Sequence, residues 1–160
     1  CDYPLLDNYY PNSKFIYLTR ELDNWLPSIK QLLQRMSVNL LRADGGFNPT
    51  IKRCYQQVFS PFNAENIASD DFLIGCYQRH QAQITEYFAD KPEQLFTLDV
   101  SKPESFNKLH QFLLLPEMIQ SFDQLNIGGK ITAWKDLTHP NKIASTRNGK
   151  SSALNYFNNL

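Results

Sequence analysis

Two short apolar segments, rich in β-branched and aromatic residues, constrain the fold of this 160-residue chain more than any other feature. Residues 14–19 read Lys-Phe-Ile-Tyr-Leu-Thr, and residues 94–100 read Gln-Leu-Phe-Thr-Leu-Asp-Val. Short runs of this kind, bounded by polar residues and prolines, predict two buried strands. Because helical patterns fill much of the sequence between and after them, we expect an α/β fold in which helices cover a parallel sheet.

The first helical pattern is expected after Asp23, its predicted N-cap, and fades before the Asp-Gly-Gly of residues 44–46. Pro27 is compatible with this helix because we expect it in the first turn, where backbone N–H groups lack intrahelical partners. The apolar residues of the pattern are Trp25, Ile29, Leu32, Leu33, Met36 and Leu40.

Two more helices are predicted, one from Ser69-Asp70 to residues 90–92 and one after residues 101–104. Residues 47–69 are expected to be mostly loop, although residues 52–59 could form a short helix. Four aromatic side chains of this stretch either line a cleft or pack beneath the loop: Phe47, Tyr55, Phe59 and Phe62.

Charge and hydropathy exclude several classes of partner. Sixteen basic residues balance 16 acidic ones, so the chain has no overall basic field and we expect no nucleic-acid partner. The densest apolar run, residues 112–115, stops at Pro116 and is far shorter than the roughly 20 residues that span a bilayer, so no membrane span is expected.

The cysteines and the start of the chain bear on the compartment. Three cysteines with no C-x-x-C spacing favour reduced thiols, and residues 1–4 have no signal-peptide pattern, so a cytoplasmic location is predicted. The chain opens at Cys1 rather than Met. We therefore expect a processed chain or a piece of a longer one, whose lost part could have carried a signal or an anchor.

Arg20 and Ser28 are the first candidates for a binding site. Arg20 ends the first predicted strand, and Ser28 lies in the first turns of the next helix. Ligands of open α/β sheets bind at the carboxyl ends of strands, and helix N-termini attract anions, so a guanidinium and a hydroxyl here could hold a phosphate. The alternative is an exposed serine and a surface arginine paired with Glu21 or Asp23.

A second basic cluster spans residues 145–152, Ser-Thr-Arg-Asn-Gly-Lys-Ser-Ser. Two cations, hydroxyls and a glycine make an anion-binding loop plausible there. Residues 144–151 come within one residue of a Walker A motif, but they lack both the preceding strand and room for the long helix that follows one. We therefore reject a nucleotide hydrolase built on this segment.

The remaining polar candidates are few. The three histidines have no metal-ligand spacing, so no metal is expected. His80 is interpreted either as a hydrogen-bonded residue of a helix surface or as a site residue, and His110 as solvated. Asp99 ends the second predicted strand, where we expect it to cap the following turn.

The order of several short motifs resembles the central and C-terminal regions of sulfotransferases that use 3′-phosphoadenosine 5′-phosphosulfate (PAPS). The matching residues run through nearly the whole chain: Asp2-x-Pro4, Tyr10-Pro11-Asn12-Ser13-Lys14-Phe15-Ile16, Leu18-Thr19-Arg20, Trp25-Leu26, Ser28, Tyr77-x-x-His80, Tyr87-Phe88, Gln94-Leu95-Phe96-x-Leu98-Asp99-Val100, Lys108-Leu109-x-x-Phe112-Leu113, Asn126, Trp134-Lys135, Pro140-Asn141-Lys142 and Ser145-Thr146-Arg147-Asn148-Gly149. Each piece alone is weak, but their order and spacing together are more specific.

The resemblance implies a cofactor site. In this family the arginine at the strand end and the serine in the following helix bind the 3′-phosphate, which points to Arg20 and Ser28. In the family, an Arg-Lys-Gly loop late in the chain binds the same phosphate. Arg147, Asn148 and Gly149 resemble this loop, with Asn148 in place of the lysine, and Lys150 is the candidate that would replace the missing cation. Glu21-Leu22 replaces the usual Asp-Pro, which is expected to alter only the turn.

The resemblance also implies a single domain over residues 1–160 with a P-loop-kinase-like twisted parallel sheet, incomplete at its N-terminus. The family's phosphosulfate-binding strand, loop and helix, and its usual catalytic base, precede the region that matches Asp2, and neither is present. His80 is the candidate base within this chain. The expected activity is PAPS-dependent sulfuryl transfer, without a metal, to a hydroxyl or amine of a small-molecule, lipid or carbohydrate acceptor, and the 160 residues alone need not be active. The alternative is a non-catalytic interaction domain on the same scaffold.

Overall fold

A computed structural model describes residues 2–116 and residue 122 of the chain. Its elements are, in order, α1 (Tyr3–Tyr9), β1 (Phe15–Leu18), α2 (Leu22–Leu41), α3 (Pro49–Val58), the 3-10 helix η1 (Asn66–Ala68), α4 (Asp70–Tyr87), the 3-10 helix η2 (Pro92–Gln94), β2 (Leu95–Leu98) and α5 (Ser105–Phe112). Both predicted strands and all three predicted helices are confirmed. So is the short helix considered within residues 47–69, although it begins at Pro49.

The two strands pair in parallel, which confirms the predicted α/β arrangement. Phe15 of β1 faces Leu95 of β2, and the register continues to Leu18 opposite Leu98. The connection between the strands carries α2, α3 and α4, as a parallel pair requires. The P-loop-kinase-like type of sheet stays a prediction.

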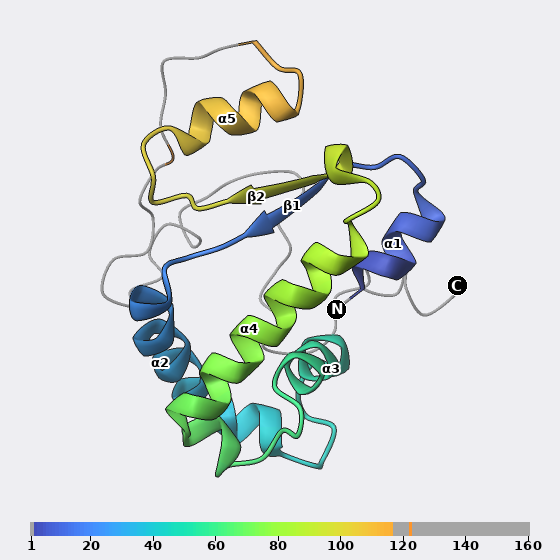
Figure 1. The fold of residues 1–160 in the computed structure, drawn as a ribbon. Coiled ribbons are helices and arrows are strands. Elements are labelled where there is room, and N and C mark those ends of the chain that lie inside the picture. The colour runs from blue at the N-terminus through green and yellow to red at the C-terminus, as the bar shows by residue number, and fades with distance from the viewer. Residues whose placement is uncertain (1, 117–121, 123–160) are drawn as a thin grey trace, which may run out of the picture.

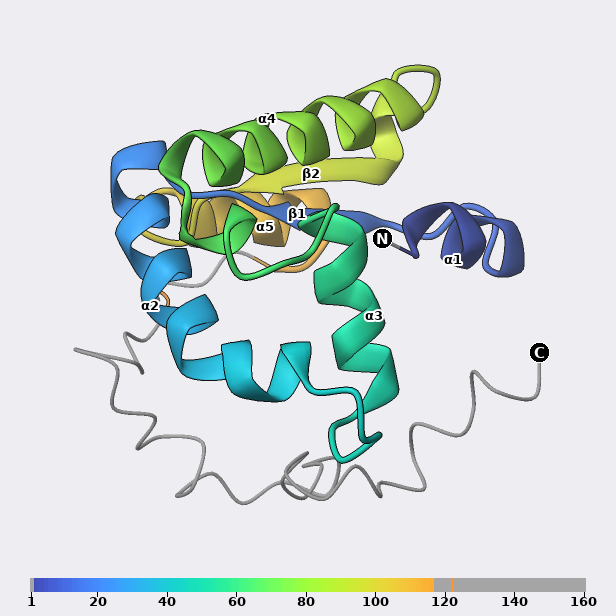
Figure 2. The same cartoon turned by 90° about the horizontal axis from the view of Figure 1, so that it is seen from below.

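Helices α4 and α5 lie on opposite faces of this sheet (Figures 1 and 2). On one face, the ring centroids of Phe15 and Phe88 lie 4.9 Å apart, and on the other those of Phe96 and Phe112 lie 5.1 Å apart. On the α5 face, α5 packs against β2, and the side chain of Leu18 in β1 is 64 % exposed. The prediction of a buried first strand therefore holds in part: Phe15 and Tyr17 are partly buried on the α4 face, whereas the described residues leave the other face of β1 exposed.

The largest apolar core lies among α2, the segment that contains α3 and η1, and α4. Its buried members are Leu33, Leu40, Phe59, Ile67, Leu73 and Cys76, and Phe47, Tyr55 and Phe62 pack against them. The four aromatic residues between 47 and 62 are thus core residues, so the packing interpretation is confirmed for them. One member of the predicted apolar pattern, Leu32, is instead 41 % exposed.

Helix α2 begins earlier than its sequence pattern indicated. The backbone N–H of Trp25 donates to the carbonyl of Glu21 at 2.9 Å, and Glu21 is the N-cap residue. Asp23 therefore lies inside the first turn, and the prediction that it caps the helix is wrong. For the same reason Pro27 falls in the second turn and not in the first, so the Asp23 carbonyl lacks its usual i+4 donor.

Helix α1 was not predicted from the sequence. Its contacts with the rest of the domain include the ring of Tyr3, whose centroid lies 5.1 Å from that of Tyr87, and two sets of charged groups. The carboxylate of Asp7 accepts hydrogen bonds from the Tyr87 hydroxyl at 3.0 Å and from the Lys91 ammonium. Asp2, the residue before the helix, pairs with both terminal nitrogen atoms of the same guanidinium, that of Arg53, at 2.7 and 2.8 Å.

Candidate functional site

The carboxyl ends of β1 and β2 form one edge of the sheet. The N–H of Thr19 donates to the Leu98 carbonyl at 2.8 Å, which extends the pairing one residue beyond the strands. Arg20 and Asp99 therefore leave the sheet side by side, and the charge of Arg20 contributes to lowering the pKa of Asp99. This edge is where open α/β sheets bind ligands.

Arg20 is exposed, and its guanidinium makes no hydrogen bond or salt bridge within residues 2–116 and 122. The suggested pairing with Glu21 is not observed, because the carboxylate of Glu21 lies 3.4 Å from the ammonium of Lys102. The backbone of Arg20, in contrast, is held in place. The Tyr77 hydroxyl of α4 donates to the Arg20 carbonyl at 2.8 Å.

The start of α2, which follows Arg20 directly along the chain, offers further donors. The N-cap Glu21 makes no side-chain bond to the first N–H groups, so the side chain leaves the helix N-terminus uncapped. Ser28 lies in the second turn, is exposed, and has no hydrogen-bond partner for its hydroxyl in the described part of the chain. A cation, a helix N-terminus and a hydroxyl are the groups that hold a phosphate in many proteins.

Asp99 acts as a turn-capping residue, as predicted. Its Oδ1 accepts hydrogen bonds from the Ser101 N–H at 2.9 Å and the Ser101 hydroxyl at 2.6 Å. The bond from the Ser101 hydroxyl is the main cause of the lowered pKa of Asp99. A carboxylate held ionised in this way is a poor proton acceptor, so Asp99 is not a candidate base.

The second basic cluster cannot be placed beside Arg20. Arg147, Asn148, Gly149 and Lys150 lie outside the described residues, so their convergence on the same phosphate stays a prediction.

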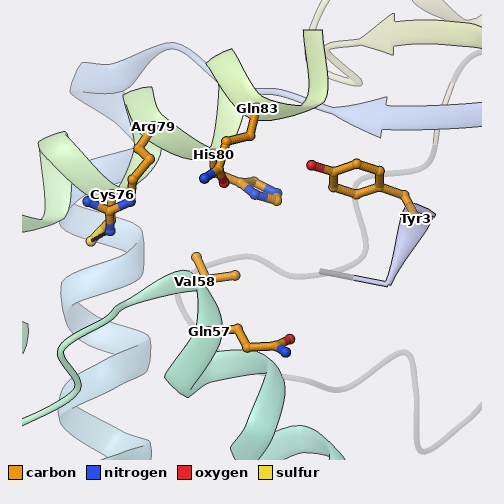
Figure 3. Close-up of a pocket in the computed structure, with 7 residues that line it drawn as sticks. All are labelled: Tyr3, Gln57, Val58, Cys76, Arg79, His80 and Gln83. Atoms are coloured by element: carbon orange, nitrogen blue, oxygen red, sulfur yellow. Dashed lines mark hydrogen bonds between the residues drawn. The ribbon is translucent and has the colours of Figure 1, made fainter. Parts of the chain in front are cut away.

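A cavity of about 180 Å³ lies between α1, α3 and α4 (Figure 3). The residues that line it are Tyr3, Gln57, Val58, Cys76, Arg79, His80 and Gln83. The close-up shows the ring of Tyr3 directed toward the imidazole of His80, with Val58 and Gln57 on the α3 side. Among these residues Gln57, Arg79 and Gln83 are exposed, so the cavity is open to solvent.

His80 is half-buried at this cavity. Its ring lies edge-on to that of Tyr17 in β1, with 5.9 Å between the centroids. Burial lowers the pKa of His80 below its ordinary value of 6.5, so the imidazole is neutral at pH 7 and can accept a proton. His80 lines this cavity, and its role as a site residue stays a prediction.

Arg79 and Cys76 form the far wall of the cavity. The Arg79 guanidinium donates to the Ser60 carbonyl at 3.4 Å and to the Cys76 sulfur at 3.2 Å. Burial raises the pKa of the Cys76 thiol despite the nearby cation. The thiol is therefore protonated at neutral pH, which argues against Cys76 as a nucleophile.

Three site features were missed by sequence reasoning. These are the hydroxyl of Tyr77 on Arg20, the contribution of Tyr3 to the cavity and the placement of Arg79 in its wall. The only signal was the i, i+3 spacing of Tyr77 and His80, which places both on one side of α4. Nothing in the local sequence links either residue to α1.

The described residues contain neither a metal-binding group nor a helix that could span a bilayer. No group of three side chains is placed to hold a metal ion in residues 2–116 and 122. The same part of the chain contains no helix with both the length and the apolar character needed to cross a bilayer. His110 is not simply solvated: its ring lies 4.5 Å from that of Phe106, and its Nδ1 lies 2.8 Å from the Pro116 carbonyl oxygen.

Comparison with known proteins gives one result. No curated protein and no solved structure matches the chain. A family model described as "Sulfotransferase domain" matches residues 1–131, which include both strands, all the described helices and the edge at Arg20 and Ser28. On this match, the chain belongs to the sulfotransferase domain family.

Proposed function

We propose that this domain transfers the sulfuryl group of PAPS to a hydroxyl or amine of an acceptor, and that Arg20 and Ser28 bind the 3′-phosphate of the donor. Membership of the family supports sulfuryl transfer in general. The choice of PAPS and the roles of the two residues rest on the resemblance and on the geometry at the carboxyl end of β1.

One observation carries the proposal: Arg20 is exposed at the sheet edge, and its guanidinium forms no salt bridge or hydrogen bond in the described chain, although the charge of Asp99 lies close enough to interact with it. A cation left in that position is available to a dianionic phosphate, which it can bind through two parallel hydrogen bonds. The uncapped start of α2 and the Ser28 hydroxyl add donors of the right kind. The residues present therefore fit a phosphate group.

PAPS would supply the activated sulfur. In the transfer, a bond would form between the acceptor oxygen or nitrogen and this sulfur, while the bond between the sulfur and the bridging oxygen of the donor phosphate would break. The acceptor would lose a proton. Transfers of this kind depend mainly on positioning and on charge stabilisation. We assign the role of proton acceptor to the neutral imidazole of His80. His80 lies three residues after Tyr77 on α4, which corresponds to a rise of about 4.5 Å along the helix. His80 would act as general base, and Tyr77 would hold the Arg20 backbone.

The remaining assignments, which concern the second basic cluster, the acceptor and the compartment, rest mainly on the resemblance to the family. Arg147, Asn148, Gly149 and Lys150 are proposed to complete the phosphate grip, and the acceptor is a small molecule, lipid or carbohydrate. No metal is required by this scheme. The cytoplasm is the proposed compartment, supported by the buried thiol of Cys76, which forms no disulfide in the described residues.

The test is calorimetric titration of the full-length protein with adenosine 3′,5′-bisphosphate, the product of the donor. Saturable binding is expected. Removing one charged hydrogen-bond partner costs about 1.5–3 kcal/mol, so Arg20→Ala should weaken binding by about tenfold or more. Ser28→Ala removes a neutral donor and should weaken binding about three- to tenfold.

Arg42→Ala is the matched control. Arg42 follows the other end of α2, about 30 Å of helix away, and is paired with Asp44 at 2.5 Å. It should bind the nucleotide like the wild type. Absence of saturable binding, or equal binding by Arg20→Ala and the wild type, would refute the proposal. Binding without any transfer to a broad set of acceptors would favour the non-catalytic interaction domain.

A further inference from the structure

An acidic side chain lies beside the proposed phosphate site. Glu21 directly follows Arg20 in the chain and is the N-cap residue of α2. Within residues 2–116 and 122, its carboxylate neither caps that helix nor pairs with Arg20. A carboxylate in either place would compete with an anionic ligand for the guanidinium or for the free N–H groups at the start of the helix.

Lys102 is the partner that Glu21 has instead. Its ammonium lies 3.4 Å from Oε1 of Glu21. Lys102 belongs to the turn after β2, whereas Glu21 follows β1, so the ion pair joins the two segments that leave the sheet at its carboxyl edge. The pKa of Asp99 is lowered mainly by its hydrogen bond from Ser101, and the charges of Lys102 and Arg20 also contribute. Both cations therefore lie near that carboxylate.

The backbones of both partners are fixed by hydrogen bonds. The Glu21 carbonyl accepts from the Trp25 N–H at 2.9 Å. The Lys102 N–H donates to the Asp99 carbonyl at 3.2 Å, and the Lys102 carbonyl accepts from the N–H of the buried Ser105 at 3.1 Å. Side chains that start from ordered backbone lose less freedom on pairing than side chains on two loose segments.

The pair explains why one cation is left over at this edge. Of the two carboxylates here, that of Asp99 accepts from the backbone and hydroxyl of Ser101, and that of Glu21 lies at Lys102. Neither is ion-paired with Arg20 in the described chain. The availability of the Arg20 guanidinium thus depends on where the Glu21 carboxylate is held.

We propose that Lys102 is a positioning residue of the phosphate site: it holds the Glu21 carboxylate away from Arg20 and from the start of α2, and so leaves both free for an anion. That this raises affinity for the donor phosphate rests on the proposed function. That Lys102 determines where the Glu21 carboxylate lies does not.

The first experiment is calorimetric titration of the full-length protein with adenosine 3′,5′-bisphosphate at low salt. Lys102→Ala should weaken binding about two- to fivefold, the range set by an exposed charge pair. Adding Glu21→Gln to Lys102→Ala should restore the wild-type affinity, and Lys102→Arg should retain it. Raising the salt from about 20 mM to about 300 mM should narrow the difference between Lys102→Ala and the wild type, because salt screens exposed charges but not lost packing.

Arg42→Ala is the matched control. It removes a cation from an ion pair of similar exposure, with side chains 39 % and 59 % exposed against 47 % and 66 % for Lys102 and Glu21. Because Arg42 follows the other end of α2, this variant should bind the nucleotide like the wild type. Wild-type affinity in Lys102→Ala would overturn the proposal. An equal loss with and without Glu21→Gln would also overturn it, since Lys102 would then bind the phosphate itself.

A second experiment needs no nucleotide. NMR at pH 6 follows the side-chain Nε–H signal of Arg20 and the backbone N–H signal of Asp23 in the first turn of α2. At least one of the two should shift in Lys102→Ala and return to its wild-type position when Glu21→Gln is added. If neither signal shifts, the Glu21 carboxylate is not held by Lys102 and the proposal fails. If the signals behave as expected but the wild type does not bind the nucleotide, only the proposed function fails.

Discussion

At the scale of single residues, Tyr77 connects the packing of α4 with the proposed phosphate site. Its hydroxyl donates to the Arg20 carbonyl at 2.8 Å, and its ring centroid lies 4.7 Å from that of Trp25 at the start of α2. The phenol thus touches both sides of the turn between β1 and α2. We infer that it keeps the Arg20 guanidinium in position for a ligand at the sheet edge.

Tyr77→Phe is expected to weaken binding of adenosine 3′,5′-bisphosphate about three- to tenfold, because a hydrogen bond worth about 0.5–1.5 kcal/mol is lost. Calorimetry of the full-length protein measures this. Tyr87→Phe is the matched control, since that hydroxyl bonds Asp7 at the other end of α4. Equal affinities for Tyr77→Phe and the wild type would show that the hydroxyl does not position Arg20.

His80 should make folding stability depend on pH. Its pKa in the folded state lies below the ordinary 6.5, so the unfolded chain binds the proton more readily. The stability from His80 is therefore fully present above about pH 6.5 and is lost as pH falls through that value toward the folded pKa. Urea unfolding between pH 7.5 and pH 5 should show this loss, and His80→Gln should reduce it. An unchanged pH profile in His80→Gln would contradict the assignment.

Residue identity alone revealed only part of these sites. Arg20 and Ser28 could be singled out from the sequence, because the end of the first predicted strand and the start of the next helix can be read from the apolar pattern. The surroundings of His80 could not be, since Tyr3 and Gln57 line the same cavity only through tertiary packing. Periodicity within α4 carries no information about which distant helix faces it.

At the scale of elements, helix α1 illustrates a segment that its own sequence does not specify. It has 7 residues, too few for a helix to be stable alone in water. Its stability comes from contacts that are distant in sequence, including Asp7 with Tyr87 and Lys91. The predicted helices α2 and α4 have 20 and 18 residues and a repeated apolar pattern, which is why their existence could be read from the sequence.

Asp7→Asn should detach α1 in part and lower the free energy of unfolding at pH 7. The bond from Lys91 is the main cause of the lowered pKa of Asp7. Its contribution to stability is present above the ordinary carboxyl value of 3.8 and is lost as pH falls through the lowered folded value. Urea unfolding at pH 7 and pH 3 should show a larger difference between the variant and the wild type at pH 7.

Asp90→Asn is the control for this measurement. Asp90 lies just after α4, is exposed, and forms no ion pair among the described residues. Its replacement should leave unfolding unchanged. If Asp7→Asn is also as stable as the wild type at pH 7, α1 is not held by this carboxylate.

Asn48 should be essential to the start of α3. Its side chain is 2 % exposed and accepts a hydrogen bond from the Ile51 N–H at 3.1 Å. Loss of a helix N-cap costs about 0.5–2 kcal/mol, and the burial of Asn48 places Asn48→Ala toward the upper end. Ser69→Ala, which removes the exposed cap of α4, should cost less. Chemical denaturation of both variants measures the difference, and an equal or smaller loss for Asn48→Ala would contradict this ranking.

At the scale of the whole molecule, two strands and their flanking helices create the sheet edge at Arg20 and a cavity between α1, α3 and α4. The parallel pairing was predictable, because strands separated by helices must return in the same direction. The cavity was not, since three helices from separate parts of the sequence enclose it. The open α5 face of β1 was also unforeseen, because an apolar strand pattern does not show which face receives a helix.

The central claim is that the phosphate on the 3′ position of the donor binds at Arg20. The most direct test compares the affinities of adenosine 3′,5′-bisphosphate and adenosine 5′-monophosphate for the wild type and for Arg20→Ala. The wild type should prefer the bisphosphate by about tenfold or more, because only that nucleotide carries the charged group which Arg20 binds. In Arg20→Ala this preference should fall by about tenfold or more while affinity for the monophosphate is retained, because the other residues proposed to bind the 3′-phosphate are still present. A preference that is undiminished in Arg20→Ala would place the 3′-phosphate elsewhere and contradict the claim.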